Sequence, residues 1–140
     1  MQASDTVHAT CVAIDRGGVL IKGKSGSGKS GLALQLLTMG AVLVADDRVV
    51  LDDQSDGVWA SCPGPLTGLI EARGVGILRA VSLTRVAVKV VVDLDVLEVD
   101  RVPALRHIQL CGHKVPLLHR VDSIHFAPAL VQYMRGGRNE

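Results

Sequence analysis

Residues 23–30 (GKSGSGKS) have the spacing Gly-x-x-x-x-Gly-Lys-Ser, the pattern of a Walker A phosphate-binding loop. Glycines allow successive backbone N–H groups to point inward and surround an anion without a clash from Cβ. We expect Lys29 to bind the β- and γ-phosphate oxygens of a nucleotide and the hydroxyl of Ser30 to bind Mg²⁺. The other phosphate contacts would come from Gly23, Lys24, Ser25, Gly26, Ser27 and Gly28.

Two adjacent carboxylates, Asp46 and Asp47, follow the apolar run 41–45 (AVLVA). The end of a strand beside a phosphate loop is where a nucleotide–metal site needs a metal ligand or a base. Adjacent side chains on an extended chain point to opposite sides, so we expect the two carboxylates to play different roles. A solvated pair of turn residues is the alternative.

A second glycine-containing stretch, IEARGVGI, places Glu71 ahead of Arg73, Gly74 and Gly76. These residues alone fit two interpretations equally well: a carboxylate of a site, or a strand end followed by a turn. His8 taken alone is typical of an ordinary strand residue. The local pattern therefore assigns no role to Glu71 or His8.

The elements that would position these side chains belong to an α/β domain with many strands and few helices. A strand and turn over 8–18 lead to a short strand at 19–21, and a helix from residue 31 ends at Gly40. The strand and the helix flank the loop without a gap, which disfavours a flexible Gly/Ser linker. One helix and one turn separate the loop from strand 41–45, so we expect this strand directly beside the loop.

The second half of the chain is predicted to be mostly strands, and 140 residues fit one domain spanning 1–140. The expected elements are a hairpin of 49–51 and 58–61, a strand at 69–71, two β-rich runs within 84–97, a strand at 114–118 and a helix at 128–135.

Composition excludes several functional classes. The aromatic share of 2% and the net charge of +1 argue against nucleic-acid binding by base stacking or by a basic surface. Three widely spaced cysteines without a CxxC pair predict free thiols rather than disulfides or a zinc site. Neither a signal peptide nor an apolar run of roughly 20 residues is present, so we expect a cytoplasmic protein without a membrane segment.

Several stretches in order resemble the catalytic domain of the HPr kinase/phosphorylase family, over residue 7 to about residue 101. They are VHATCV, GVLIKGKSGSGKS, a short helix, LVADDRV and IEARGVGIL. The interval between GKS and ADD and the Glu-x-Arg-Gly-x-Gly signature are those of the family. The resemblance implies a P-loop domain like the phosphoenolpyruvate carboxykinase nucleotide domain, with a strand-rich mixed sheet and few helices, and usually a hexamer.

The resemblance also implies an activity and roles for named residues. The family transfers phosphate from Mg-ATP to a serine of the phosphocarrier protein HPr, and pyrophosphate is another donor to consider. Lys29 would contact phosphate, and Ser30 and Glu71 would hold Mg²⁺. Asp47 would be the base, and the acid in the reverse reaction. His8 and Arg101 match catalytic residues of the family, while Asp46, Arg73, Gly74 and Gly76 would support the site.

The chain departs from the family in two respects. Longer members carry an N-terminal domain before the catalytic one, whereas here the phosphate loop begins at residue 23, so we expect a short form with the catalytic half alone. The family also has a basic loop, P-x-R-x-G-R-N, that is tied to phosphorolysis. The corresponding stretch here is VPLLHRVDSIHF, in which His119 and Arg120 are the cationic candidates, so kinase activity is the more secure prediction.

Two alternatives stay open beside an HPr kinase. A small-molecule kinase on the same scaffold would need a closed pocket for a metabolite. A regulatory module that senses ATP without transferring phosphate would need Lys29 but not Asp47.

Overall fold

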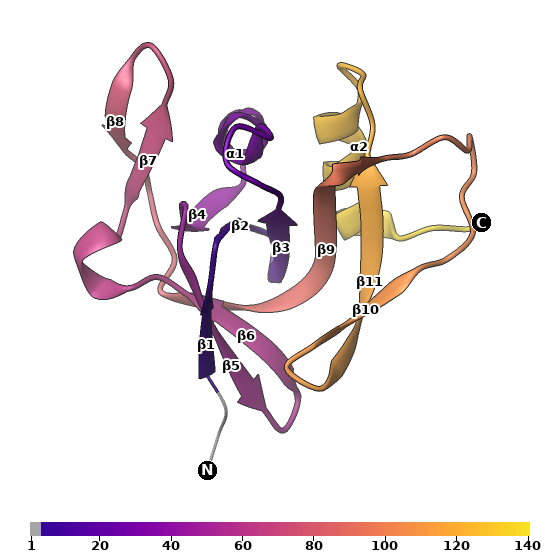
Figure 1. Ribbon diagram of the computed structural model, residues 1–140, viewed down its shortest axis with the longest axis horizontal. Helices are drawn as coiled ribbons and strands as arrows, with labels where there is room; N and C mark the ends of the chain where they lie inside the picture. Colours follow the sequence, from indigo (N-terminus) through magenta and orange to yellow (C-terminus); the bar gives the residue numbers. More distant parts are fainter. Residues whose placement is uncertain (1–3) are drawn as a thin grey trace.

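The computed structural model describes residues 4–140, most of which form a mixed sheet with two α-helices (Figure 1). The helices are α1 (Lys29–Thr38) and α2 (Phe126–Gly136), and a single 3-10 turn, η1, spans Gly64–Leu66. The strands are β1 (Ser4–Val7), β2 (Ala9–Ile14), β3 (Gly17–Lys22), β4 (Val42–Ala45), β5 (Val49–Gln54), β6 (Gly57–Ser61), β7 (Leu69–Ala72), β8 (Gly76–Arg79), β9 (Arg85–Leu97), β10 (His107–Leu110) and β11 (His113–Arg120).

The strand order of the main sheet is β1-β5-β6-β9-β3-β2-β4, and the β10–β11 hairpin joins it through β11 and β9. β9 runs parallel to β3 and β11, and the other pairs are antiparallel. β7 and β8 form a separate hairpin. The predicted class, a strand-rich mixed α/β sheet with few helices, is confirmed.

Strand β9 holds the sheet together, because it pairs with β6 near its start, β3 in its middle and β11 near its end. The prediction of two separate runs within 84–97 is wrong, since one strand of 13 residues covers this region. The register shifts between Gly18 and Val19, whose partners on β9 are Val88 and Val90. The extra residue, Lys89, interrupts the alternation of inward and outward side chains, which explains why the pattern looked like two runs.

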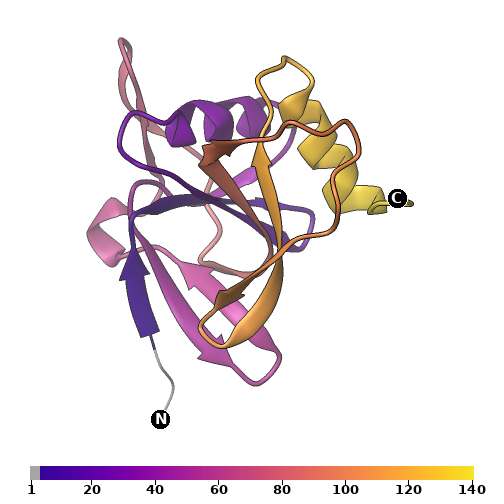
Figure 2. The same cartoon turned by 45° about the vertical axis from the view of Figure 1, so that its right-hand side comes forward.

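Apolar side chains fill both sides of the sheet. One core lies under α1 and α2 and includes Val12, Ile21, Leu36 and Leu130. The other lies on the opposite face and includes Cys11 of β2, Leu20 of β3 and Val91 of β9. Figure 2 shows both helices on one side of the β2–β3 hairpin. Neighbouring residues of β2 and β3 therefore point to different cores, as the period of two of a strand requires.

The position of β4 differs from the expectation. The sequence predicts strand 41–45 directly beside the phosphate loop, but β2 lies between β4 and β3, the strand that leads into this loop. The tight turn at Asp15 folds β2 back along one edge of β3, while β9 occupies the other edge. β4 therefore pairs with β2, and only the residues that follow it reach the loop.

The remaining predicted elements are present with small shifts in their bounds. The predicted hairpin is β5–β6, strand 114–118 is β11, and the terminal helix is α2. The strand predicted at 8–14 begins one residue later in the structure, as β2, because a bend at His8 separates β1 from β2. Strand β10 was not predicted. Neither helix within residues 4–140 is long and apolar enough to cross a membrane.

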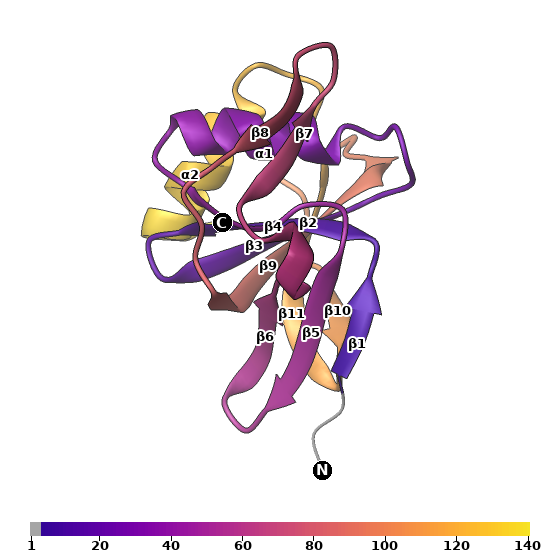
Figure 3. The same ribbon diagram turned by 90° about the vertical axis from the view of Figure 1, so that its left-hand side faces the viewer.

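The β7–β8 hairpin stands beside α1 and overhangs the end of β4 (Figure 3). This arrangement brings residues that are far apart in the sequence to one edge of the sheet, where the loop after β3, the start of α1 and the hairpin meet.

Candidate active site

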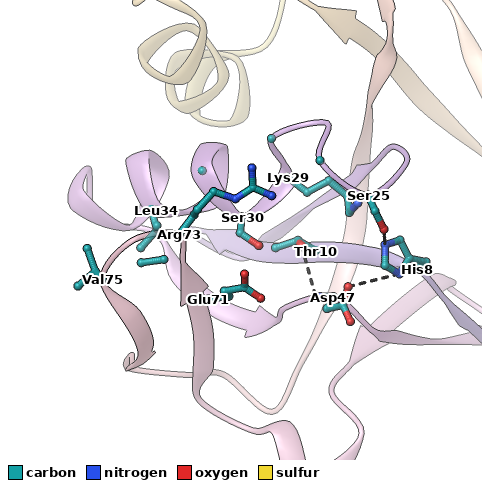
Figure 4. A pocket seen from close by; sticks show the side chains of 14 residues that line it. His8, Thr10, Ser25, Lys29, Ser30, Leu34, Asp47, Glu71, Arg73 and Val75 are labelled. Carbon is teal, nitrogen blue, oxygen red and sulfur yellow. Dashed lines mark hydrogen bonds and ion pairs between the residues drawn. The ribbon is translucent and has the colours of Figure 1, made fainter.

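A hollow of about 590 Å³ opens where these elements meet. Figure 4 shows its side chains converging from the loop and start of α1 on one side, β2 and the end of β4 in the middle, and β7 on the other. The residues that line it are His8, Thr10, Ser25, Gly26, Gly28, Lys29, Ser30, Gly31, Leu34, Asp47, Glu71, Ala72, Arg73 and Val75.

The predicted phosphate loop connects β3 directly to α1. Gly28, the residue before α1, has a φ of 101°, which favours glycine strongly. A Cβ on Gly23 would lie 2.5 Å from Oγ of Ser27, so this position requires glycine for space. The spacing of glycines thus follows from backbone geometry, as predicted for a loop that turns its N–H groups inward.

Lys29 is buried, and its ammonium lies across the loop. Its Nζ donates hydrogen bonds to the carbonyl oxygens of Gly23, at 2.7 Å, and Lys24, at 3.1 Å. The backbone N–H of Lys24 in turn donates to the carboxylate of Asp95 on β9, at 3.1 and 3.2 Å to the two oxygens. These contacts fix the start of the loop and hold a positive charge at its centre.

Asp46 is buried at the floor of the site and accepts three hydrogen bonds. Its Oδ1 accepts from the hydroxyls of Ser30, at 2.7 Å, and Thr10, at 2.9 Å, while its Oδ2 accepts from the backbone N–H of Glu71, at 2.9 Å. Burial of a charged group is tolerated only with such partners. Asp46 therefore joins α1, β2 and β7.

Asp47 points away from Asp46 into the open pocket, and its side chain is 60% exposed. Its Oδ1 lies 3.3 Å from Nδ1 of His8, and Nε2 of His8 lies 3.4 Å from Oγ of Ser25 on the loop. The φ of Asp47 is 69°, an uncommon value outside glycine that Asp tolerates better than most residues. The two adjacent carboxylates thus have different environments, as expected, but they lie in a bend after β4 and not in the extended segment from which this was predicted.

Glu71 and Arg73 reach the pocket from β7 and the turn that follows it (Figure 4). Gly74 and Gly76 shape this turn with φ values of 87° and 141°. Glu71 is exposed and lines the pocket, and its backbone N–H and the hydroxyl of Ser30 are both hydrogen-bonded to Asp46. The glycines act through the backbone here, since neither lines the hollow.

Ser30 and Glu71 bring hard oxygen donors to the wall of the pocket, and the buried Asp46 accepts a hydrogen bond from Ser30. Mg²⁺ prefers such donors, and it usually binds one or two carboxylates together with phosphate oxygens and water. No group of three or more His, Cys, Asp or Glu side chains within residues 4–140 has the geometry of a metal site. The hydroxyl of Ser30 and the carboxylate of Glu71 fit a Mg²⁺ ion that is also bound by phosphate oxygens and water.

Of the predicted catalytic residues, Arg101 is the one that does not line this pocket. It is exposed in the loop between β9 and β10, and it is not among the residues that line the hollow. Its catalytic role stays a prediction.

Sequence reasoning missed Thr10 and Asp95. Thr10 is fully buried in β2, and its one signal was a polar residue within an otherwise apolar strand. Asp95 gave no local signal, because its contact with Lys24 spans 71 positions of the chain.

A second, shallower hollow of about 300 Å³ lies on the other side of the loop. It shares Gly28 and Gly31 with the first, and polar and apolar side chains contribute to its wall in similar measure. The other residues that line it are Ser27, Leu32, Gln35, Leu94, Arg120, Val121, Ser123 and Phe126.

The sequence of residues 1–101 matches the family model described as HPr Serine kinase C-terminal domain. The HPr kinase/phosphorylase of Alkaliphilus metalliredigens is 43% identical over 94 residues, which are 66% of this chain and 30% of that protein. The HPr kinase/phosphorylase of Bordetella pertussis is 49% identical over 74 residues, which are 52% of this chain and 24% of that protein. The chain thus spans less than a third of the length of these relatives.

The fold is also similar to the solved structure of the HPr(Ser) kinase/phosphatase from Coxiella burnetii. The TM-score is 0.79 at 26% sequence identity, and the match covers 94% of this chain and 88% of that chain. The similarity therefore extends beyond residue 101.

Proposed function

The chain belongs to the HPr Serine kinase C-terminal domain family, and we propose that it is a Mg-ATP-dependent kinase that phosphorylates a serine of HPr or of an HPr-like phosphocarrier protein. One catalytic domain, residues 1–140, would perform the transfer, and a hexamer is the expected assembly. One observation carries the proposal: the phosphate loop, Asp47 and Glu71 line one open pocket, and Asp46 is hydrogen-bonded to Ser30 at its base.

The loop would hold the phosphates of the donor. Its backbone N–H groups and the N-terminal end of α1 favour an anion, and Lys29 already directs its charge into the loop. Ser30 and Glu71 would hold Mg²⁺, which supplies charge stabilisation of the transferred phosphoryl group. Asp46 would orient Ser30 through their hydrogen bond.

Asp47 would be the base. A serine hydroxyl is a poor nucleophile, so a carboxylate within hydrogen-bond reach has to accept its proton during transfer. The serine oxygen then bonds to the γ-phosphorus, the bond to the β-phosphate breaks, ADP leaves, and the proton stays on Asp47. His8 would orient Asp47 through the contact between them.

The open position of Asp47 favours a protein acceptor. Its side chain is 60% exposed, so a serine on the surface of a partner can approach it. A small-molecule kinase needs walls around the acceptor, and an ATP sensor has no use for an exposed carboxylate beside the phosphates. Arg101 would join the site only after a loop movement or from a neighbouring copy of the chain.

The reverse reaction, phosphorolysis of phosphoserine, is the less supported half of the proposal. The stretch that corresponds to the family's basic loop supplies Arg120, which is bound to Asp122 and to the carbonyl oxygen of Leu94. Arg120 borders the second hollow, on the side of the loop away from Asp47.

A phosphotransfer assay tests the proposal. The purified chain is incubated with Mg-ATP and HPr from the same organism, and the intact mass of HPr is measured. We expect one added phosphate on a serine, with no addition when Lys29→Ala or Asp47→Asn replaces the natural chain. Nucleotide binding without any transfer to HPr would reject this acceptor and favour a metabolite kinase or an ATP sensor.

A further inference from the structure

The hydroxyl of Thr10 lies between the two carboxylates of the site. Its Oγ1 donates to Oδ1 of Asp46 at 2.9 Å and accepts from the backbone N–H of Asp47 at 3.4 Å. A hydroxyl carries one donor and two acceptor positions, so both hydrogen bonds form at once. Among the described residues, Thr10 is the one whose side chain is hydrogen-bonded to both Asp46 and Asp47.

We propose that Thr10 is a positioning residue that sets Asp47 relative to the metal-binding wall of the pocket. This inference rests on the proposed function, because it takes Asp47 as the base. Thr10 itself would touch neither the nucleotide nor the acceptor.

The backbone of Asp47 needs such support, because its φ of 69° is uncommon for a residue other than glycine. Two backbone hydrogen bonds flank it, from the N–H of Ala9 to the carbonyl of Asp47, at 3.2 Å, and from the N–H of Arg48 to the carbonyl of Asp46, at 2.8 Å. The bond to Thr10 is the one from a side chain. It can therefore be removed by substitution while the backbone bonds stay.

Thr10 also completes a chain of contacts that begins and ends on the phosphate loop. Ser25, near the tip of the loop, contacts His8, and Ser30, at the start of α1, contacts Asp46. The full order is Ser25, His8, Asp47, Thr10, Asp46 and Ser30. Loss of the Thr10 hydroxyl would divide this series of contacts into one part on the acceptor side and one part on the metal side.

Simple packing does not account for a threonine here. Thr10 is fully buried in β2, and the other residues of this strand are apolar and buried. Valine fills almost the same volume in a strand without the cost of burying a hydroxyl. The hydroxyl therefore has a role through its two partners, and the substitution Thr10→Val removes that role with little change in volume.

Steady-state kinetics of Thr10→Val and Thr10→Ser, with Mg-ATP and HPr, test the proposal. For Thr10→Val we expect kcat to fall roughly 10- to 100-fold, because a small misplacement of a catalytic group has effects of this size. The KM for ATP should stay within about twofold, since the loop is intact. Thr10→Ser keeps the hydroxyl and should retain most of kcat.

A control comes from Thr38→Val, which removes an exposed hydroxyl at the end of α1 that is bonded to the carbonyl of Gln35. This variant should leave kcat unchanged. If Thr10→Val does not fold, Thr10→Cys keeps the side-chain volume with a weak donor and takes its place. An unchanged kcat in Thr10→Val, or an equal loss in Thr10→Ser, would overturn the proposal.

A second measurement does not depend on the acceptor. Hydrogen exchange of peptides covering residues 46–48, followed by mass spectrometry without nucleotide, should be faster in Thr10→Val than in the natural chain and in Thr10→Ser. Exchange at the same rate in all three would contradict the proposal. If the natural chain does not phosphorylate HPr, the proposed function fails, while this exchange experiment still decides whether Thr10 fixes Asp47.

Discussion

Asp46 and Asp47 are neighbours in the sequence, but they face opposite environments. Asp46 is 7% exposed and accepts hydrogen bonds from three elements, whereas the Asp47 side chain is 60% exposed and contacts His8. One carboxylate can therefore hold the site together while the other stays free to accept a proton. This division makes their substitutions separable by experiment.

Asp47→Asn should abolish transfer while leaving the fold and nucleotide binding intact. We expect a loss of about 10²- to 10⁴-fold in kcat, the usual contribution of a general base. Asn also tolerates a positive φ, and Asp47 is exposed, so the free energy of unfolding should change by less than about 0.5 kcal/mol. The measurements are phosphotransfer kinetics, calorimetric titration with Mg-ATP, and urea unfolding. Transfer at the natural rate would rule out Asp47 as the base.

Asp46→Ala should destabilise the protein instead. It leaves the hydroxyls of Thr10 and Ser30 and the N–H of Glu71 without their acceptor, and we expect a loss of about 3 kcal/mol in the free energy of unfolding. Asp100→Ala, at an exposed position, is the matched control and should change stability little. Urea unfolding curves measure both. Equal midpoints for the two variants would contradict the structural role of Asp46.

Local motifs of this site were predictable because their geometry involves neighbours in the sequence. Successive glycines between a strand and a helix are typical of an anion-binding loop. The different environments of Asp46 and Asp47 were expected from the alternation of an extended chain, but the two residues lie in a bend, and Asp47 has a left-handed backbone. The place of Glu71 in the pocket that Ser30 also lines was expected only from family resemblance, since IEARGVGI alone fits a turn equally well.

Contacts between distant residues were not predictable in the same way. Thr10 and Asp46 are 36 positions apart, and their contact exists because β2 lies between β3 and β4, a strand order that loop lengths alone do not specify. The bulge at Lys89 made β9 look like two strands in the sequence, because it changes which residues of the strand face which of the two cores. Tertiary pairing, not local preference, decides both features.

A large side chain placed in the second hollow should weaken the binding of ATP but not the binding of pyrophosphate. The loop and the start of α1 border both hollows, and the larger one holds the charged groups of transfer, so we expect the nucleoside of ATP to extend into the smaller one. Gln35→Trp puts a large side chain there from an exposed position of α1. We expect binding of Mg-ATP to weaken at least about tenfold, equal to 1.4 kcal/mol, while binding of Mg-pyrophosphate stays the same.

The control for this substitution is Gln132→Trp, at an exposed position of α2 that does not line either hollow. Calorimetric titration of both variants with both ligands gives the comparison. Unchanged binding of Mg-ATP to Gln35→Trp would show that the nucleoside lies elsewhere.

Cys11 should make the protein sensitive to alkaline pH. It is fully buried, and burial raises the pKa of its thiol from 9.0 to about 12. The folded chain therefore keeps this proton after the unfolded chain has lost it, so the stability that the neutral thiol contributes is present below pH 9 and is lost as the pH rises towards 12.

Between pH 9 and 10.5 the natural chain should lose about 1.5 kcal/mol more in the free energy of unfolding than Cys11→Ala. Burial also raises the pKa values of Cys62, Cys111 and Tyr133. These groups are present in both proteins, so their contributions to the stability cancel in the difference. Urea unfolding at a series of pH values measures this slope, and parallel curves for the two proteins would mean that the thiol of Cys11 ionises as readily in the folded chain as in the unfolded one.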